Sequence, residues 1–181
     1  ITVRMTLNHT SGLPGTTGEN NFGFAWNKDV YKELLDTLSQ AHLKHRPGEM
    51  ATYCNDGFTL AEMVVARVSG QSYLDFITNR IFTPLSLQNT GPSVGFEPRE
   101  GAKIARFYPP GKVFSEPLEV LSVLAAGGLS SSAEDLCRFA DTFSGKGIRL
   151  LSERSLAEIK KEQPATFHGK LRNPDVNWGL G

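Results

Sequence analysis

Apolar positions recur at helical spacing along most of the chain. Between residues 58 and 69, apolar side chains fall three or four positions apart, the period of a helix with one apolar face. Gly70 follows directly, at the position where a glycine commonly ends a helix. The apolar face predicted for this helix consists of Leu60, Ala61, Val64, Val65 and Val68.

The same reasoning predicts helices in other stretches. Ser72, Ser132 and Ser152 each stand where a helix would begin, and a serine there accepts a hydrogen bond from the first turn. Asn27 is the corresponding cap for the helix over residues 28–43. The apolar face of that helix is predicted to be Val30, Tyr31, Leu34, Leu35 and Leu38. These further helices span residues 3–9, 28–43, 73–82, 118–126, 133–143 and 153–162.

Loops separate the predicted helices. Residues 14–27 are rich in Gly, Asn and Thr, and residues 88–117 are rich in Pro and Gly. Strand-like pieces around 104–107 and 113–114 allow a small β-hairpin. Gly127-Gly128 lacks the spacing and the lysine of a phosphate-binding loop, so a tight turn with close backbone approach is predicted there. The predicted fold class is therefore mostly α.

Composition narrows the class of protein. The chain has 181 residues, of which 39% are hydrophobic and 21% charged, as in globular proteins. Its 19 basic and 19 acidic residues give zero net charge, so neither nucleic acid nor an anionic membrane is indicated as a partner. The longest apolar stretch, residues 120–129, is too short to cross a bilayer. No motif calls for a cofactor.

The cysteines and one histidine are interpreted as structural. Cys54 and Cys137 are expected to be small packing residues, with Cys137 on the buried side of its helix. Whether the two cysteines meet is left open. His9 lies near Ser11 but lacks the third group of a catalytic triad. We expect His9 to organise its loop by hydrogen bonding to backbone.

The remaining histidines do not predict a metal site. His42 and His45 are three positions apart, a spacing that can place two ligands on one side of a helix. Lys44 and Arg46 beside them disfavour a cation, and no carboxylate or cysteine is near. His168 lies in a polar tail with no identifiable partner.

The segment Tyr53-Cys54-Asn55 carries the strongest candidate chemistry. In an extended segment Tyr53 and Asn55 point to the same face and Cys54 to the opposite one. A phenol beside a carboxamide, just before a helix, could form half of an acyl-transfer site. Alternatively, Tyr53 is a packing residue and Asn55 an N-cap or turn residue. The spacing by itself favours this structural interpretation.

Five sequence segments, taken in their order along the chain, favour the catalytic interpretation of Tyr53 and Asn55 over the structural one. Together they resemble the serine beta-lactamase superfamily, specifically the class C beta-lactamases and the penicillin-binding-protein-like serine hydrolases. The resemblance covers nearly all of the chain, and the order of the motifs is more specific than any one of them. The segments are NHTSGLP (8–14), PGEMATYCN (47–55), VSGQSY (68–73), IFTPL (81–85) and AGGLSSSAEDL (126–136).

The resemblance assigns Tyr53 and Asn55 to the second of three catalytic motifs, Tyr-x-Asn. The first motif, Ser-x-x-Lys, and the third, Lys-Thr-Gly or His-x-Gly, do not occur in the 181 residues, since His168-Gly169-Lys170 has the wrong order. The family places the first motif before the segment at 8–14 and the third after residue 181. We therefore expect residues 1–181 to be a partial domain. It would be the helical subdomain, without the main antiparallel sheet, and the missing α/β subdomain would be its docking partner.

The resemblance also implies a function. The parent protein is expected to be a serine hydrolase that hydrolyses a beta-lactam, a D-amino peptide or an ester through an acyl-enzyme, with no cofactor and no metal. Tyr53 would be the general base or proton relay, and Asn55 would bind the substrate amide or orient the lysine. The isolated chain is expected to be inactive. Most such relatives act outside the cytoplasm, so an extracytoplasmic location is expected.

Two other classes of function stay open. One is a non-catalytic beta-lactamase-like binding module, and the other is a self-contained helical domain with an unrelated function. The partial-domain interpretation requires Tyr53 at an open surface, with an apolar patch where the absent subdomain would dock. A Tyr53 enclosed by the core of this chain would contradict it.

Overall fold

The computed structural model describes residues 1–16, 22–93, 100–101, 103–117, 120–145, 147–163 and 180. These residues are mostly helical, so the predicted fold class is confirmed. A π-helix, η2, continues directly from α4. The helices are α1 (Val3–Leu7), α2 (Val30–Gln40), α3 (Asn55–Ser69), α4 (Tyr73–Ile77), η2 (Thr78–Phe82), α5 (Ala133–Ser144) and α6 (Glu153–Lys160).

The strands found among these residues are short and pair over long distances in sequence. The strand β1 (Phe22–Gly23) pairs antiparallel with β3 (Val120–Leu121), and β2 (Gly91–Pro92) pairs antiparallel with β4 (Leu129–Ser130). The hairpin expected between 104 and 114 is reduced to a single antiparallel bridge, between Phe107 and Glu116. The described part of the chain contains no larger sheet.

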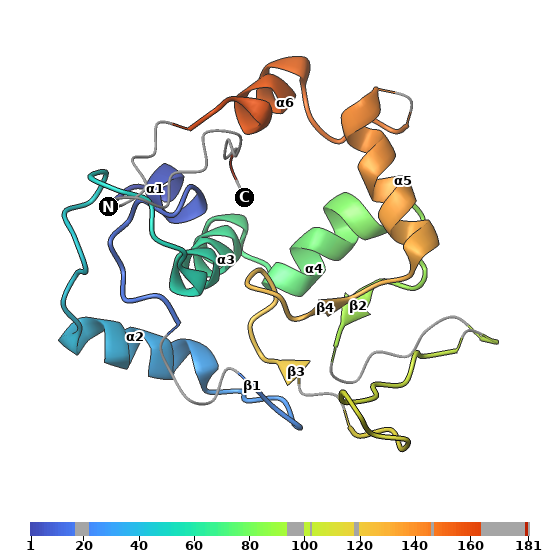
Figure 1. Cartoon of the computed structure of the whole chain (residues 1–181). Helices are drawn as coiled ribbons and strands as arrows, with labels where there is room; N and C mark the ends of the chain where they lie inside the picture. Colours follow the sequence, from blue (N-terminus) through green and yellow to red (C-terminus); the bar gives the residue numbers. More distant parts are fainter. Residues whose placement is uncertain are drawn as a thin grey trace.

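Helix α3 lies centrally among the helices and contacts α1, α2 and α4. In Figure 1 it lies beside α1 and α4, with α2 below it and α5 and α6 further out. Gly57 lets α1 approach closely, because a Cβ at this position would lie 2.8 Å from the Thr6 carbonyl oxygen. A separate buried cluster of Ile77, Phe82, Leu85 and Leu87 joins η2 to α5 and to the segment before α6.

The predicted helix ends are largely confirmed. The hydroxyl groups of Ser72, Ser132 and Ser152 each accept a hydrogen bond from a backbone N–H in the first turn of α4, α5 and α6. Gly70 ends α3 in the left-handed conformation, with φ of 69°. Because caps depend on neighbouring residues, they could be read from local sequence alone.

Asn27 is not the cap of α2. The helix begins at Val30, and the Asn27 side-chain oxygen accepts a hydrogen bond from the Asp29 N–H at 3.0 Å, in the turn before the helix. Asn27 also bonds outward, since its N–H donates to the Ser122 hydroxyl. The predicted apolar face is wrong at Leu35, which is 47% exposed, whereas Val30 and Leu34 are buried.

The apolar face predicted for α3 is wrong at Val64 and Val68, while Leu60, Ala61 and Val65 are partly buried. Val64 and Val68 are exposed, Val68 to 82%, whereas the buried positions of this helix are Asp56, Gly57, Thr59 and Glu62. The packed side of α3 is polar because neighbouring elements supply hydrogen bonds to it. Polar side chains can be buried when their hydrogen bonds are satisfied, so apolar periodicity alone cannot identify the buried face.

A helix is predicted over residues 118–126, but the described part of this stretch, residues 120–126, is not helical. Val120–Leu121 is strand β3, and a turn follows through residue 127. The chain folds tightly back on itself here, because a Cβ on Gly128 would lie 2.6 Å from the Leu121 carbonyl oxygen and 2.7 Å from that of Val123. Pairing with β1 therefore overrides the local helical pattern. The close backbone approach expected at Gly127-Gly128 is confirmed.

The two cysteines behave differently. Cys54 is 1% exposed, as expected for a packing residue, but Cys137 is exposed, so its predicted burial is wrong. Helix α5 instead buries Asp135 and Thr142. Both cysteines are free thiols. Within the described ranges no helix is long and apolar enough to span a membrane.

Candidate functional site

Residues 8–16 form a buried polar loop that supports Tyr53. Asn8, His9, Thr10 and Ser11 are all less than 9% exposed. Some of their polar groups bond within the loop: the Asn8 side-chain oxygen accepts from the Thr10 N–H at 3.2 Å and from the Thr10 hydroxyl at 2.7 Å. A loop this buried needs such internal bonds because unsatisfied polar groups are costly away from water.

Backbone hydrogen bonds attach this loop to the segment from residue 44 to residue 56. The two segments are therefore held together along their length rather than at one point. The bonds run from Lys44 N–H to Gly12 O (2.8 Å), Gly48 N–H to Thr10 O (2.7 Å), Thr52 N–H to His9 O (2.9 Å) and Asp56 N–H to Gly15 O (2.8 Å).

His9 fixes the backbone on both sides of Tyr53. Its carbonyl accepts from the Thr52 N–H, and its Nδ1 accepts from the Cys54 N–H at 3.0 Å. Burial lowers the pKa of His9, and an accepting Nδ1 requires a neutral ring that carries its proton on Nε2. The expected loop-organising role of His9 is confirmed. His9 also has a left-handed backbone, with φ of 61°, which is uncommon outside glycine.

Tyr53 stands on this support and faces solvent. Its side chain lies in an extended segment and is 63% exposed, which meets the requirement that it lie at an open surface. The Tyr53 ring lies 4.7 Å from the His9 ring between centroids, and the His9 ring lies 5.3 Å from that of Phe58. The Cys54 side chain points to the opposite, buried side, as the alternation predicts.

Asn55 does not continue the extended segment. It is the first residue of α3, and the extended residue before the helix is Cys54, with φ of −151° and ψ of 104°. The strand-like segment predicted to hold both Tyr53 and Asn55 therefore ends at Cys54, and the alternative that Asn55 is the N-cap is wrong. The Asn55 amide reaches the loop instead and donates to the Thr16 hydroxyl at 2.9 Å.

Two charged residues at this site did not emerge from the sequence as site residues. Asp56 is 1% exposed, and its carboxylate accepts from the Gly15 N–H at 3.1 Å. The Lys44 ammonium group lies beside the same loop, because a Cβ on Gly15 would be 3.0 Å from Lys44 Nζ. The only sequence signal for Asp56 was its place directly after Asn55, and Lys44 entered only as a charge unfavourable to a metal.

The site offers proton transfer and amide recognition. A phenol can exchange a proton, and a carboxamide both donates and accepts hydrogen bonds. Ser11 is not placed as a nucleophile, because it is fully buried and its hydroxyl accepts from the Leu13 N–H. Among the described residues, no group of three or more His, Cys, Asp or Glu side chains could hold a metal ion. His168 lies outside the described residues.

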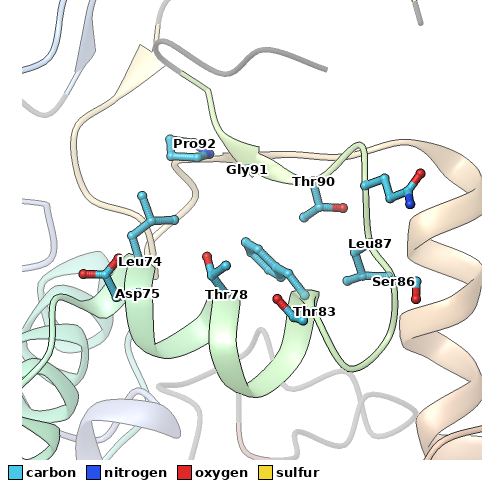
Figure 2. A pocket seen from close by; sticks show the side chains of 11 residues that line it. Leu74, Asp75, Thr78, Thr83, Ser86, Leu87, Thr90, Gly91 and Pro92 are labelled. Carbon is cyan, nitrogen blue, oxygen red and sulfur yellow. The ribbon is translucent and has the colours of Figure 1, made fainter. Parts of the chain in front are cut away.

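A cavity of about 520 Å³ lies elsewhere, between η2 and β2. Figure 2 shows Thr78, Thr83 and Thr90 around it, with Leu74 and Pro92 at one side. One of its hydroxyl groups is already engaged, since Thr90 donates to the buried Asp135 carboxylate at 2.9 Å. Neither Tyr53 nor Asn55 lines this cavity.

Penicillin-binding proteins of known name are similar in sequence to this chain. Penicillin-binding protein 4* of Bacillus subtilis strain 168 is 34% identical over 95 residues, which cover 50% of this chain and 21% of the relative. Penicillin-binding protein 4 of Amycolatopsis lactamdurans is 26% identical, over 100% of this chain and 49% of the relative. The chain therefore spans half or less of the length of these relatives.

Solved structures match the fold. A D-amino acid amidase from Ochrobactrum anthropi SV3, complexed with L-phenylalanine amide, is 28% identical with a TM-score of 0.74, covering 100% of this chain and 53% of the amidase. A beta-lactamase/D-alanine carboxypeptidase from Pseudomonas syringae is 26% identical with a TM-score of 0.67, covering 90% of this chain and 44% of that enzyme. The sequence model of the Beta-lactamase family matches residues 1–181, and the chain belongs to that family.

Proposed function

We propose that this chain supplies Tyr53 and Asn55 to the acyl-transfer site of a serine hydrolase. The observation that carries the proposal is the contrast between Tyr53 and its support. The phenol is 63% exposed, whereas His9 and Cys54, which hold its backbone, are buried. A tyrosine needed only for packing would bury its ring. An exposed ring on a backbone bonded at both neighbouring residues suits a group that must meet a substrate in a fixed position.

In the proposed reaction, a serine outside these 181 residues attacks an acyl carbonyl, and Tyr53 takes the serine proton. Tyr53 then gives that proton to the leaving group, and water hydrolyses the acyl-enzyme. A tyrosine has a pKa of about 10 in water, so the base form needs positive charge nearby. The lysine of Ser-x-x-Lys would supply this charge, with Lys44 as a second cation beside Gly15. Asn55 would bind the substrate amide.

The names of the relatives support proposals for the substrate class and the location of the protein. The relatives and neighbours are described as penicillin-binding proteins, a D-amino acid amidase and a beta-lactamase/D-alanine carboxypeptidase. We take the substrate to be a beta-lactam, a D-amino peptide or an ester, and the location to be extracytoplasmic. Because no Ser-x-x-Lys, Lys-Thr-Gly or His-x-Gly occurs in residues 1–181, the chain by itself should not hydrolyse these compounds.

Two measurements test the proposal. The 181-residue chain is assayed with a chromogenic cephalosporin and a short-chain ester; hydrolysis that is lost in Tyr53→Phe would show that the chain needs no outside nucleophile. In a protein that also carries Ser-x-x-Lys, Tyr53→Phe should lower kcat by about 10² to 10⁴. Tyr108→Phe is the matched control, because Tyr108 is also exposed, at 50%. Equal activity of the two variants would contradict the role of Tyr53. The binding-module alternative predicts no acyl-enzyme by mass spectrometry.

A further inference from the structure

A second cavity lies beside α3, on the side of the helix that packs against α2 and α4. Its volume is about 610 Å³, within the usual range for small-molecule sites. Three aromatic side chains line it, namely Trp26, Tyr31 and Tyr73, and Leu124 adds an apolar surface. Neither Tyr53 nor Asn55 lines this cavity, so it is separate from the proposed acyl-transfer site.

Glu62 places a carboxylate in the wall of this cavity. The side chain is 2% exposed, and both of its oxygens accept hydrogen bonds. The Tyr31 hydroxyl donates to Oε1, and the Ala125 N–H donates to Oε2 at 2.8 Å. Burial raises the pKa of Glu62, and the hydrogen-bond donors oppose this shift only in part. The Leu124 backbone also hydrogen-bonds to this carboxylate, so one of its about four lone-pair positions remains available for a ligand.

Among the described residues, Glu62 forms no ion pair. The basic side chains that form ion pairs in the described part of the chain are Arg4, Lys32, Arg138 and Arg149, and their partners are acidic residues other than Glu62. Arg67 also lines the cavity, but it is exposed and forms no ion pair with Glu62 in this part of the chain. A buried carboxylate in a protein is normally paired with a positive charge. The described residues provide no such ion pair for Glu62.

We propose that this cavity binds an organic cation, an amine whose ammonium group faces Glu62 and whose apolar or aromatic part lies among Trp26, Tyr31 and Tyr73. The ammonium supplies a positive charge and donates to the remaining lone pair of the carboxylate. Aromatic faces attract cations, and Trp and Tyr do so most strongly. The cavity is large enough to take the apolar part of such an amine. This site goes beyond the acyl-transfer function and does not depend on it.

The test uses two probes of one shape, 2-phenylethylamine and the neutral 2-phenylethanol. Binding of each to the protein is measured by isothermal titration calorimetry at pH 7. The amine should bind saturably and at least about tenfold more tightly than the alcohol, a ratio that corresponds to about 1.4 kcal/mol. Saturable binding of the alcohol with equal affinity, or no saturable binding of the amine, would overturn the proposal.

Three variants identify the residues. Glu62→Gln keeps the shape and removes the charge, and should weaken amine binding by about tenfold. Trp26→Ala removes an aromatic side chain that is 41% exposed, and should weaken amine binding severalfold. Glu153→Gln removes an exposed carboxylate on α6 and serves as the charge-matched control.

The variants also decide the outcome. Unchanged amine affinity in either Glu62→Gln or Trp26→Ala would place the amine elsewhere and refute the site. Should Glu62→Gln fail to fold, Trp26→Ala and the preference for amine over alcohol decide the matter. Tyr53→Phe should leave amine binding unchanged, so failure of this proposal is distinguishable from failure of the proposed function.

Discussion

Removal of the Asp56 carboxylate should destabilise the whole support of Tyr53. Asp56 is 1% exposed in the first turn of α3, and its carboxylate accepts from the Gly15 N–H at 3.1 Å. In Asp56→Ala the buried Gly15 N–H loses this charged acceptor, which costs about 1.5 to 3 kcal/mol. The negative charge near the helix N-terminus is worth about 0.3 to 1 kcal/mol more. The expected loss of unfolding free energy is therefore about 2 to 4 kcal/mol.

Asp75→Ala is the matched control for this prediction. Asp75 also lies in the first turn of a helix, α4, but it is exposed, and its main bond is with the Ser72 hydroxyl. Its loss should cost about 1 kcal/mol or less. Urea unfolding followed by circular dichroism measures both variants. In a chain of this length, the Asp56→Ala loss corresponds to a fall in Tm of about 4 to 16 °C.

A comparison of the two variants tests whether the buried Asp56 carboxylate stabilises the loop. If Asp56→Ala lost no more unfolding free energy than Asp75→Ala, the buried bond to Gly15 would not support the site. Asp56→Asn provides a second measurement, because the amide oxygen can still accept from the Gly15 N–H. Its unfolding free energy should lie between those of the unmodified protein and Asp56→Ala, since Asp56→Asn keeps an acceptor but loses the charge.

Three further predictions concern other elements. Burial lowers the pKa of His9 in the folded protein, so the unfolded chain binds more protons below about pH 6.5. The unfolding free energy, measured by urea titration at each pH, should therefore fall as the pH drops from about 7.5 to about 5. It should fall less steeply in His9→Gln. Gly128→Ala should cost about 1 to 3 kcal/mol by urea unfolding, since its Cβ would meet two carbonyl oxygens; a neutral result would contradict the tight turn. Ser152→Ala should cost about 1 kcal/mol by thermal melting, whereas exposed Val68→Thr should change little.

Much of the candidate site was predictable because it lies in contiguous sequence. Tyr53, Cys54 and Asn55 are neighbours, and their alternation correctly predicts a buried Cys54 below an exposed Tyr53. The role of His9 followed from its place at the end of a helix. The bond from Asp56 to Gly15 was not predictable, because it joins residues 41 positions apart in the chain. No local pattern reports which distant backbone group a side chain will meet.

Local sequence was enough to predict where most helices lie and how α3 to α6 begin or end, and the order of five motifs was enough to indicate the family. The helix ends depend on residues within one turn of each other, such as Ser132 with the first turn of α5. The buried side of α3 and the strand at residues 120–121 depend instead on tertiary contacts. Glu62 is buried because Tyr31 and Ala125, both distant in sequence, supply its hydrogen bonds. Burial of a polar face depends on such partners, and apolar periodicity cannot specify them.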